Sequence, residues 1–249
     1  MTVSIGVLAG MGPRSTAPFI DMLVSACQSQ YGARYDEDFP LMHIISLPTP
    51  FRPGYPVDER AMNQALRAGI QSLVSAQTDF IVIPCNLAHC YFDEIARAAG
   101  NVPVLHIAES AVQKLPATVN KVAVLATEPV MAAGFWQDKV REAGKEVTDS
   151  EALRKQVTEL ISLIKEYGFS DPAVRECWQR VLSHPVLTQA EAVLVACTDI
   201  SPLIPPQTGR QIFIDTAENL AESAISYYTH LRALPGDGRN IAPQELAGQ

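Results

Sequence analysis

Two cysteines in matching sequence surroundings are the residues best placed to do chemistry in this chain. Cys85 ends the segment IVIPC and precedes Asn86, and Cys197 ends the segment VLVAC and precedes Thr198. Such apolar, β-branched runs predict short buried strands, so each thiol should lie where a strand gives way to a loop or helix. Open α/β sheets bind ligands at the carboxyl ends of their strands. Two thiols brought there by separate strands are suited to moving a proton from one face of a carbon atom to the other.

The chemistry that suits paired thiols is proton transfer at a weakly acidic carbon, such as the α-carbon of an amino acid. A thiolate is a soft, weakly hydrated base, and its free pKa of about 8.5 falls at a helix N-terminus or beside a cation. We expect both cysteines to lie at helix N-termini, where backbone N–H groups would also stabilise negative charge on the substrate carboxylate. Cys27 and Cys177 fall within predicted helices and are interpreted as packing residues.

Three pairs of similar segments, in the same order along the chain, indicate that the two strands belong to a repeated α/β unit. SIGVLAGMGP resembles KVAVLATEPV, DFIVIPCN resembles AVLVACTD, and VPVLHIAES resembles IFIDTAEN. The members of these pairs are separated by 117, 112 and 109 residues. Separations this similar predict two copies of one unit, each with a cysteine at the same place.

Helices are predicted between the strands, which favours mainly parallel sheets. They are expected at 16–28, 58–76, 87–99, 131–143, 150–167, 171–182 and 217–232. The predicted fold class is α/β, with two similar Rossmann-like domains related by pseudo-symmetry and the active site in the cleft between them. Residues 1–115 and 208–249 should form the first domain, because the last helix is expected to return to it, and 116–207 the second. Segment 40–56 is expected to be a cleft-lining loop, and 235–249 a frayed tail.

The composition excludes several classes of protein. The chain has 249 residues, 47% of them hydrophobic, and a net charge of −8, unlike the basic surface of a nucleic-acid-binding protein. No apolar run approaches the roughly 18 residues that a membrane span needs. Its five cysteines include no close CxxC pair, which argues against a disulfide framework and favours a reducing cytoplasm. We therefore expect a cytoplasmic protein with a small-molecule partner and without nucleic-acid or membrane partners.

The segments GVLAGMGPRST, PCNLAH and ACTDI resemble three signature segments of the aspartate/glutamate racemase family. The chain looks most like the aspartate racemase-like amino-acid racemases, which need no pyridoxal phosphate, and the resemblance runs from the first strand to about Arg232. It implies two facing α/β domains with a catalytic cysteine from each, Cys85 and Cys197, on either side of the substrate α-carbon. It also implies that no cofactor is used, and a homodimer is expected.

The same resemblance implies roles for residues beside the two cysteines. Asn86 and Thr198 would hold the α-carboxylate or the amine of the substrate. The first loop would line the pocket through Met11, Gly12, Ser15 and Thr16.

Two cations are implied to bind a side-chain carboxylate, and two other pocket positions depart from the family pattern. Arg52 falls where aspartate racemases keep a cleft-loop arginine, and Lys165 matches a lysine in a similar helix. Leu87 stands where threonine is usual, which removes a hydroxyl from the substrate pocket. Asp199 stands where glutamate is usual and is a shorter carboxylate.

Other polar residues near the motifs have alternative interpretations. Cys85, His89 and Cys90 could resemble metal ligands, but no fourth ligand stands at a useful spacing, so no metal site is expected. His89 either helps to position its helix or to tune Cys85, or it has a plain structural role. His106 and Asp215 either reach the cleft or cap the helices that follow them.

The function predicted from the sequence is an isomerase, a cofactor-independent amino-acid racemase that acts on aspartate or glutamate. One thiolate would remove the α-proton and the other thiol would return a proton to the opposite face. The alternatives are a racemase or epimerase of another amino acid, a decarboxylase, hydantoin racemase or maleate isomerase on the same scaffold, or a non-catalytic protein that binds a small acid.

Overall fold

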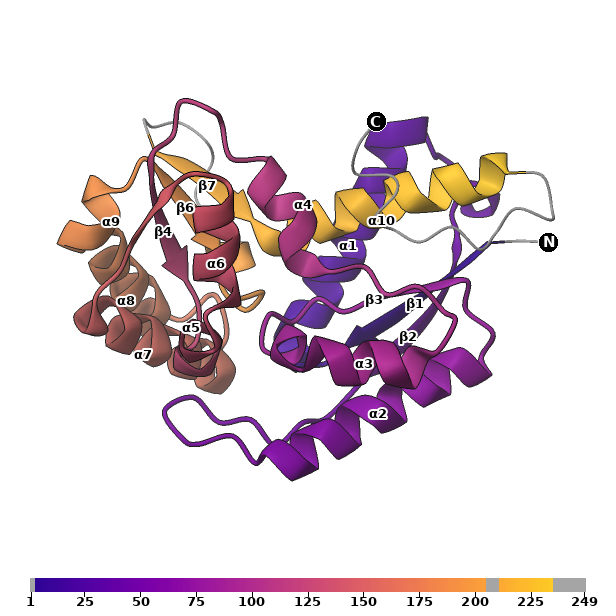
Figure 1. The fold of residues 1–249 in the computed structure, drawn as a ribbon, viewed down its shortest axis with the longest axis horizontal. Helices are drawn as coiled ribbons and strands as arrows, with labels where there is room; N and C mark the ends of the chain where they lie inside the picture. Colours follow the sequence, from indigo (N-terminus) through magenta and orange to yellow (C-terminus); the bar gives the residue numbers. More distant parts are fainter. Residues whose placement is uncertain (1–2, 205–210, 235–249) are drawn as a thin grey trace.

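The computed structural model describes residues 3–204 and 211–234, which form two α/β lobes (Figure 1). The sheet of the first lobe contains β1 (Ser4–Ala9), β2 (Leu41–Ser46) and β3 (Phe80–Val82) in the order β2-β1-β3. Both strand pairs are parallel. Val104 extends this order by a single parallel bridge to Ile81.

The sheet of the second lobe repeats this arrangement. It contains β4 (Lys121–Leu125), β5 (Glu146–Thr148), β6 (Ala192–Val195) and β7 (Ile212–Asp215) in the order β5-β4-β6-β7, all parallel. In each sheet the first strand is central, and the strand before the cysteine pairs with it. The predicted fold class, two similar α/β units with parallel sheets, is confirmed.

The strands alternate with helices as expected. The first lobe contains α1 (Thr16–Tyr31), α2 (Glu59–Ser75), α3 (Phe92–Ala99) and α4 (Ile107–Gln113). The second contains α5 (Glu128–Ala133), α6 (Phe135–Glu142), α7 (Glu151–Tyr167), α8 (Pro172–Leu182) and α9 (Pro185–Gln189), and α10 (Thr216–Ala233) follows β7. Side-chain caps start several of them, for instance at Asp58, whose Oδ1 accepts a hydrogen bond from Ala61 N at 2.9 Å. None of the helices in the described part of the chain has the length and apolar character needed to cross a membrane.

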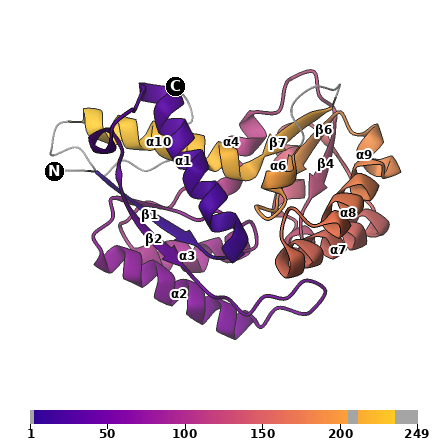
Figure 2. The same ribbon diagram turned by 180° about the vertical axis from the view of Figure 1, so that it is seen from behind.

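Helix α10 joins the two lobes. It leaves β7 in the second lobe and packs against α1 and α4 in the first, as Figures 1 and 2 show. The expected return of the last helix is therefore present. The expected boundary at residue 208 needs correction, because β7 pairs with β6 and so belongs to the second sheet. The predicted tail, 235–249, lies outside the described residues.

One hydrophobic core runs through both lobes. It extends from the first sheet through α10 to α6 and one face of β4 and β6, and it includes the fully buried Trp136. A second cluster lies between the opposite face of that sheet and α7 and α8. Because side chains in such cores are close-packed, the ends of β3 and β6 are held in a fixed relation to each other.

Three local predictions are wrong. Segment 40–56 is not all loop, since its β-branched stretch forms the edge strand β2 before the chain enters the loop at 47–58. The helix predicted at 131–143 is two helices, α5 and α6, which meet at Gly134 with φ of +80°. The helix predicted from residue 87 begins as a short 3₁₀ helix, Ala88–Tyr91, before α3.

Candidate active site

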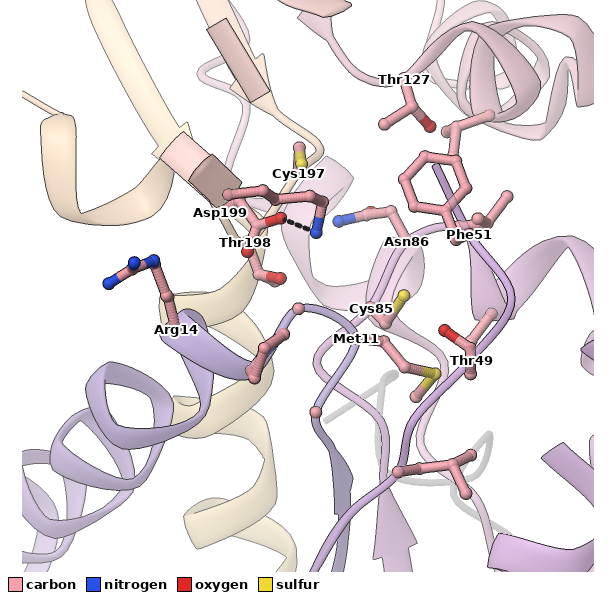
Figure 3. Close-up of a pocket in the computed structure, with 18 of the residues that line it drawn as sticks. Met11, Arg14, Thr49, Phe51, Cys85, Asn86, Thr127, Cys197, Thr198 and Asp199 are labelled. Carbon is pink, nitrogen blue, oxygen red and sulfur yellow. Dashed lines mark ion pairs between the residues drawn. The ribbon is translucent and has the colours of Figure 1, made fainter. Parts of the chain in front are cut away.

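Cys85 and Cys197 line one cavity of about 740 Å³ between the two lobes (Figure 3). Cys85 follows β3 and Cys197 follows β6, so two carboxyl strand ends deliver the thiols from opposite sides. The loop 47–58 reaches from the first lobe towards α7, since a Cβ at Gly54 would lie 4.0 Å from Thr158 Cγ2. Its residues Leu47, Pro48, Thr49 and Phe51 form part of the cavity wall.

Both thiols are held in their protonated form by their surroundings. Burial raises the pKa of Cys85 to about 11, although the backbone N–H of Ala88 and the Lys165 ammonium oppose that rise. Burial likewise raises the pKa of Cys197, and the nearby Asp199 carboxylate raises it further.

Neither cysteine lies at the N-terminus of an α-helix, which corrects the expectation. A turn and the 3₁₀ helix Ala88–Tyr91 follow Cys85, and a turn and the 3₁₀ helix Ser201–Leu203 follow Cys197. Individual backbone N–H groups take the place of a helix end. Those of Ala88 and Leu87 lower the pKa of Cys85, and that of Asp199 lowers the pKa of Cys197.

An ion pair lies between the two thiol-bearing loops. Lys165 Nζ is 2.7 Å from Asp199 Oδ2, and the side chain of Asp199 is only 5% exposed. Ser15 Oγ lies 3.0 Å from the other carboxylate oxygen. Burial alone would lower the pKa of Lys165, but the Asp199 carboxylate outweighs that effect and the pKa is raised. A Cβ at position 12 would lie 2.7 Å from Lys165 Nζ and 3.0 Å from Asp199 Oδ1, so a larger residue there would displace the pair from its present position.

The residues that follow the cysteines connect the two loops to each other. The hydroxyl of Thr198 donates to the carbonyl of Pro84 at 3.0 Å, which ties the second loop to the residue before Cys85. The Asn86 amide donates to Thr216 Oγ1 at 3.1 Å and accepts from Trp136 Nε1 at 3.0 Å.

The chain of hydrogen bonds continues from Thr216, whose hydroxyl donates to the carbonyl of Val195 in β6 at 2.9 Å. Asn86 and Thr198, predicted to hold substrate, thus also bind protein partners. Thr198 retains acceptor capacity, and Asn86 retains one N–H, so both can still meet a ligand.

His89 connects the loop of Cys85 to the start of α4 through both of its ring nitrogens. Its Nε2 accepts a hydrogen bond from Ile107 N at 3.2 Å, and its Nδ1 lies 2.8 Å from the carbonyl of Cys85. The acceptor role of Nε2 places the proton of the neutral ring on Nδ1, which donates to that carbonyl. Burial lowers the pKa of His89 to about 4, so the ring stays neutral. His106 and Asp215 cap α4 and α10 through Ala108 N and Ala217 N.

Of the remaining predicted site residues, some line the cavity and others do not belong to its described lining. Met11 and Leu87 line the cavity. Ser15 and Thr16 lie behind its wall, where Thr16 Oγ1 accepts a hydrogen bond from Gly10 N at 3.1 Å. Arg52 is exposed and does not belong to the described lining, although its neighbour Phe51 does.

Sequence reasoning missed several lining residues. Phe51 places its ring 5.8 Å from Lys165 Nζ, and its position beside Arg52 in the cleft loop was the available signal. Arg14 lines the rim, and Figure 3 shows its guanidinium directed away from the two thiols. Thr127 is a buried lining residue whose hydroxyl has no hydrogen-bond partner among the described residues. The repeat separation of 117 matches it to Gly10, which also follows the first strand of its lobe.

The described residues contain no group of three His, Cys, Asp or Glu side chains arranged to hold a metal ion. The residues that line the site provide two thiols, backbone N–H donors beside them, an ion pair and apolar side chains.

Comparison with known proteins identifies relatives over most of the chain. The model of the Asp/Glu/hydantoin racemase family matches residues 8–224. The broad-specificity amino-acid racemase RacX of Bacillus subtilis (strain 168) is 38% identical over 224 residues, which cover 90% of this chain and 97% of RacX.

Solved structures agree with this relationship. The aspartate racemase of Picrophilus torridus superposes with a TM-score of 0.77 and 25% identity, covering 91% of this chain and 94% of that one. The glutamate racemase of Francisella tularensis, solved with D-glutamate, shares the fold with a TM-score of 0.61 at 17% identity, covering 94% of this chain and 84% of that one. The chain belongs to the Asp/Glu/hydantoin racemase family and is a racemase.

Proposed function

We propose that this enzyme racemises an α-amino acid without pyridoxal phosphate, with Cys85 and Cys197 as its acid and base. The observation that carries the proposal is the placement of both thiols on one cavity, at equivalent strand ends of two repeated lobes. The similarity to RacX supports an amino acid as the substrate. Of the cysteines in the chain, the other three are absent from the cavity lining.

The reaction needs one thiolate and one thiol. The thiolate takes the α-proton from one face, and the electron pair of the broken C–H bond spreads into the substrate carboxylate. The opposite thiol then gives its proton to the other face of the α-carbon, so the two sulfurs exchange protonation states. The enantiomer that binds determines which cysteine acts as the base. Backbone N–H groups beside each sulfur lower its pKa and so favour the thiolate that the reaction needs.

The acidic substrate expected from the sequence stays a prediction, and the arrangement of the two cations gives it little support. Arg52 is exposed and outside the cavity wall. Lys165 is already paired with Asp199. The two-thiol chemistry is proposed independently of the side chain that the substrate carries.

Cysteine replacement tests the proposal. Cys85→Ser and Cys197→Ser should each lower the racemisation rate by about a thousandfold or more, measured by chiral chromatography on amino acids that the wild type converts. Each variant should still exchange the α-hydrogen of one enantiomer in heavy water, because one base remains on one face. Cys90→Ser is the matched control, since Cys90 is half-buried and outside the cavity wall. Near-normal racemisation by either active-site variant would show that the two-thiol mechanism is wrong.

A further inference from the structure

The charges of the cavity wall bear on which side chain a substrate carries, a question that rests on the proposed racemase function. Among the described lining residues, the charged ones are Arg14, Lys165 and Asp199. Lys165 and Asp199 form an ion pair with a 2.7 Å contact, in which the Asp199 side chain is 5% exposed and the Lys165 side chain 27%, so they bring no net charge to the cavity. Arg14 is exposed, and its guanidinium lies over the end of α7, where a Cβ at Gly168 would be 3.0 Å from Nη1.

The ion pair disfavours an extra carboxylate in the cavity. A substrate side-chain carboxylate that reached Lys165 Nζ would also come close to Asp199, which already occupies one side of that ammonium. Two carboxylates at one cation repel each other, and burial strengthens the repulsion. The amino-acid head group escapes this penalty because its ammonium and carboxylate charges cancel. A basic side chain would meet the same problem with the opposite sign beside Lys165.

The rest of the wall is suited to an apolar group. Carbon-rich side chains from both lobes face the cavity, and the substitution of leucine for the usual threonine beside Cys85 adds to them. They are Met11, Leu47, Phe51, Met62, Leu87 and Val130. Burying an apolar substrate side chain against such a surface is favourable by about 25 cal/mol for each Å² removed from water, whereas burying an unpaired carboxylate is costly.

We propose that the site takes amino acids with uncharged, apolar side chains, such as leucine, methionine and phenylalanine, in preference to aspartate and glutamate. The neutral Lys165–Asp199 pair excludes a second carboxylate, and the apolar wall binds the side chain. Asp199 is the residue that determines this choice of substrate class.

Binding to a variant that cannot turn over separates this proposal from the catalytic one. The double variant Cys85→Ser, Cys197→Ser is titrated calorimetrically with leucine, methionine, asparagine, aspartate and glutamate. We expect leucine and methionine to bind at least about tenfold more tightly than aspartate and glutamate, with asparagine as the uncharged isostere of aspartate. Equal or tighter binding of the acidic amino acids would overturn the proposal, as would a lack of binding by leucine and methionine. Apolar amino acids that bind but are not racemised by the wild type would contradict only the proposed function.

A further substitution tests the role of Asp199. Asp199→Asn in the same background keeps the size of the side chain and an acceptor for Ser15 Oγ, and it leaves the Lys165 ammonium without its carboxylate. Aspartate and glutamate should then bind at least about tenfold more tightly than they do to the double cysteine variant with Asp199 intact. Leucine binding should change little. An unchanged ratio of acidic to apolar affinities would show that Asp199 does not determine the substrate class.

Discussion

At the scale of single residues, the surroundings of both thiols raise their pKa values. Burial is the main cause of the raised pKa of both Cys85 and Cys197, and the Asp199 carboxylate adds to it. The Lys165 ammonium acts in the opposite direction on both sulfurs. The ion pair therefore affects the thiols through two opposing charges, and removing either one should change their acidity in a known direction.

The pH dependence of thiol alkylation follows from these charges. The thiolate is the reactive form, so the rate of alkylation of Cys85 and Cys197 by iodoacetamide should rise with pH through the alkaline range. Asp199→Asn removes a charge that raises both pKa values, so the profile should move to lower pH. At pH 7 the rate should increase by about three- to tenfold.

The opposite variant provides the check on that expectation. Lys165→Met removes a charge that lowers both pKa values, so its profile should move to higher pH. The measurement is made by mass spectrometry in a Cys90→Ser background, so that Cys90 does not react. Profiles that moved in the same direction in both variants would contradict the assignment of charges.

At the scale of elements, two loops at the carboxyl ends of β3 and β6 are tied together by side chains from beside the cysteines. The Thr198 hydroxyl reaches the Pro84 carbonyl across 114 residues of sequence. His89 fixes the Cys85 carbonyl from the other side. These contacts fix the two cysteine-bearing loops relative to each other, which general acid–base catalysis at one carbon atom requires.

Thr198→Val tests the tie between the loops. Valine has the shape of threonine without the hydroxyl, so the Pro84 carbonyl loses its partner and the loop gains freedom. We expect kcat to fall by about ten- to a hundredfold with a smaller change in KM, and Thr198→Ser to restore most of it. Thr188→Val is the matched control, because Thr188 also donates to a proline carbonyl, that of Pro185, but on an exposed helix. A loss confined to KM would indicate that Thr198 serves only to bind substrate.

At the scale of the whole molecule, the two lobes form one packed unit around the cavity. The main core spans both sheets, and α10 crosses from the second lobe to the first. Trp136 connects the two lobes. Its fully buried ring belongs to the core that both lobes share, and its indole N–H donates a hydrogen bond to Asn86 beside Cys85. Stability and the placement of Cys85 should therefore depend on the same residue.

Trp136→Phe, compared with a second tryptophan variant, tests whether the stability of the fold and the placement of Cys85 depend on the same residue. It removes both ring volume and a hydrogen bond to a buried amide, so the free energy of unfolding should fall by about 2–4 kcal/mol in urea denaturation. Activity measured where the variant is fully folded should fall as well. Trp178→Phe is the control, since Trp178 is a buried residue of α8 in the second cluster, whereas the indole that donates to Asn86 is that of Trp136. It should lower stability but leave kcat unchanged, and equal activity losses in both variants would contradict the coupling.

The repeated α/β architecture and the two strand ends that carry cysteines could be predicted from the sequence alone. Buried strands and capped helices depend on local patterning, and Cys85 and Cys197 follow their strands directly, so spacing alone placed them. The strand β2 was missed because the flanking prolines outweighed a short run that proved to be an edge strand. The break at Gly134 was missed because an isolated glycine does not reveal the sign of its φ angle.

Contacts between polar groups that are distant in sequence could be identified only in the folded structure. Asp199 follows β6 and Lys165 lies on α7, and no local pattern predicts that the two form an ion pair rather than leaving the lysine free for substrate. Asn86 finds its partner Thr216 across 130 residues, and Arg52 remains at the surface one residue from the cavity wall. Sequence motifs identify the reacting groups because each cysteine is recognised by the residues next to it in the chain. The preference for a charged or uncharged substrate depends on contacts between residues that are distant in sequence, and these contacts exist only once the chain has folded.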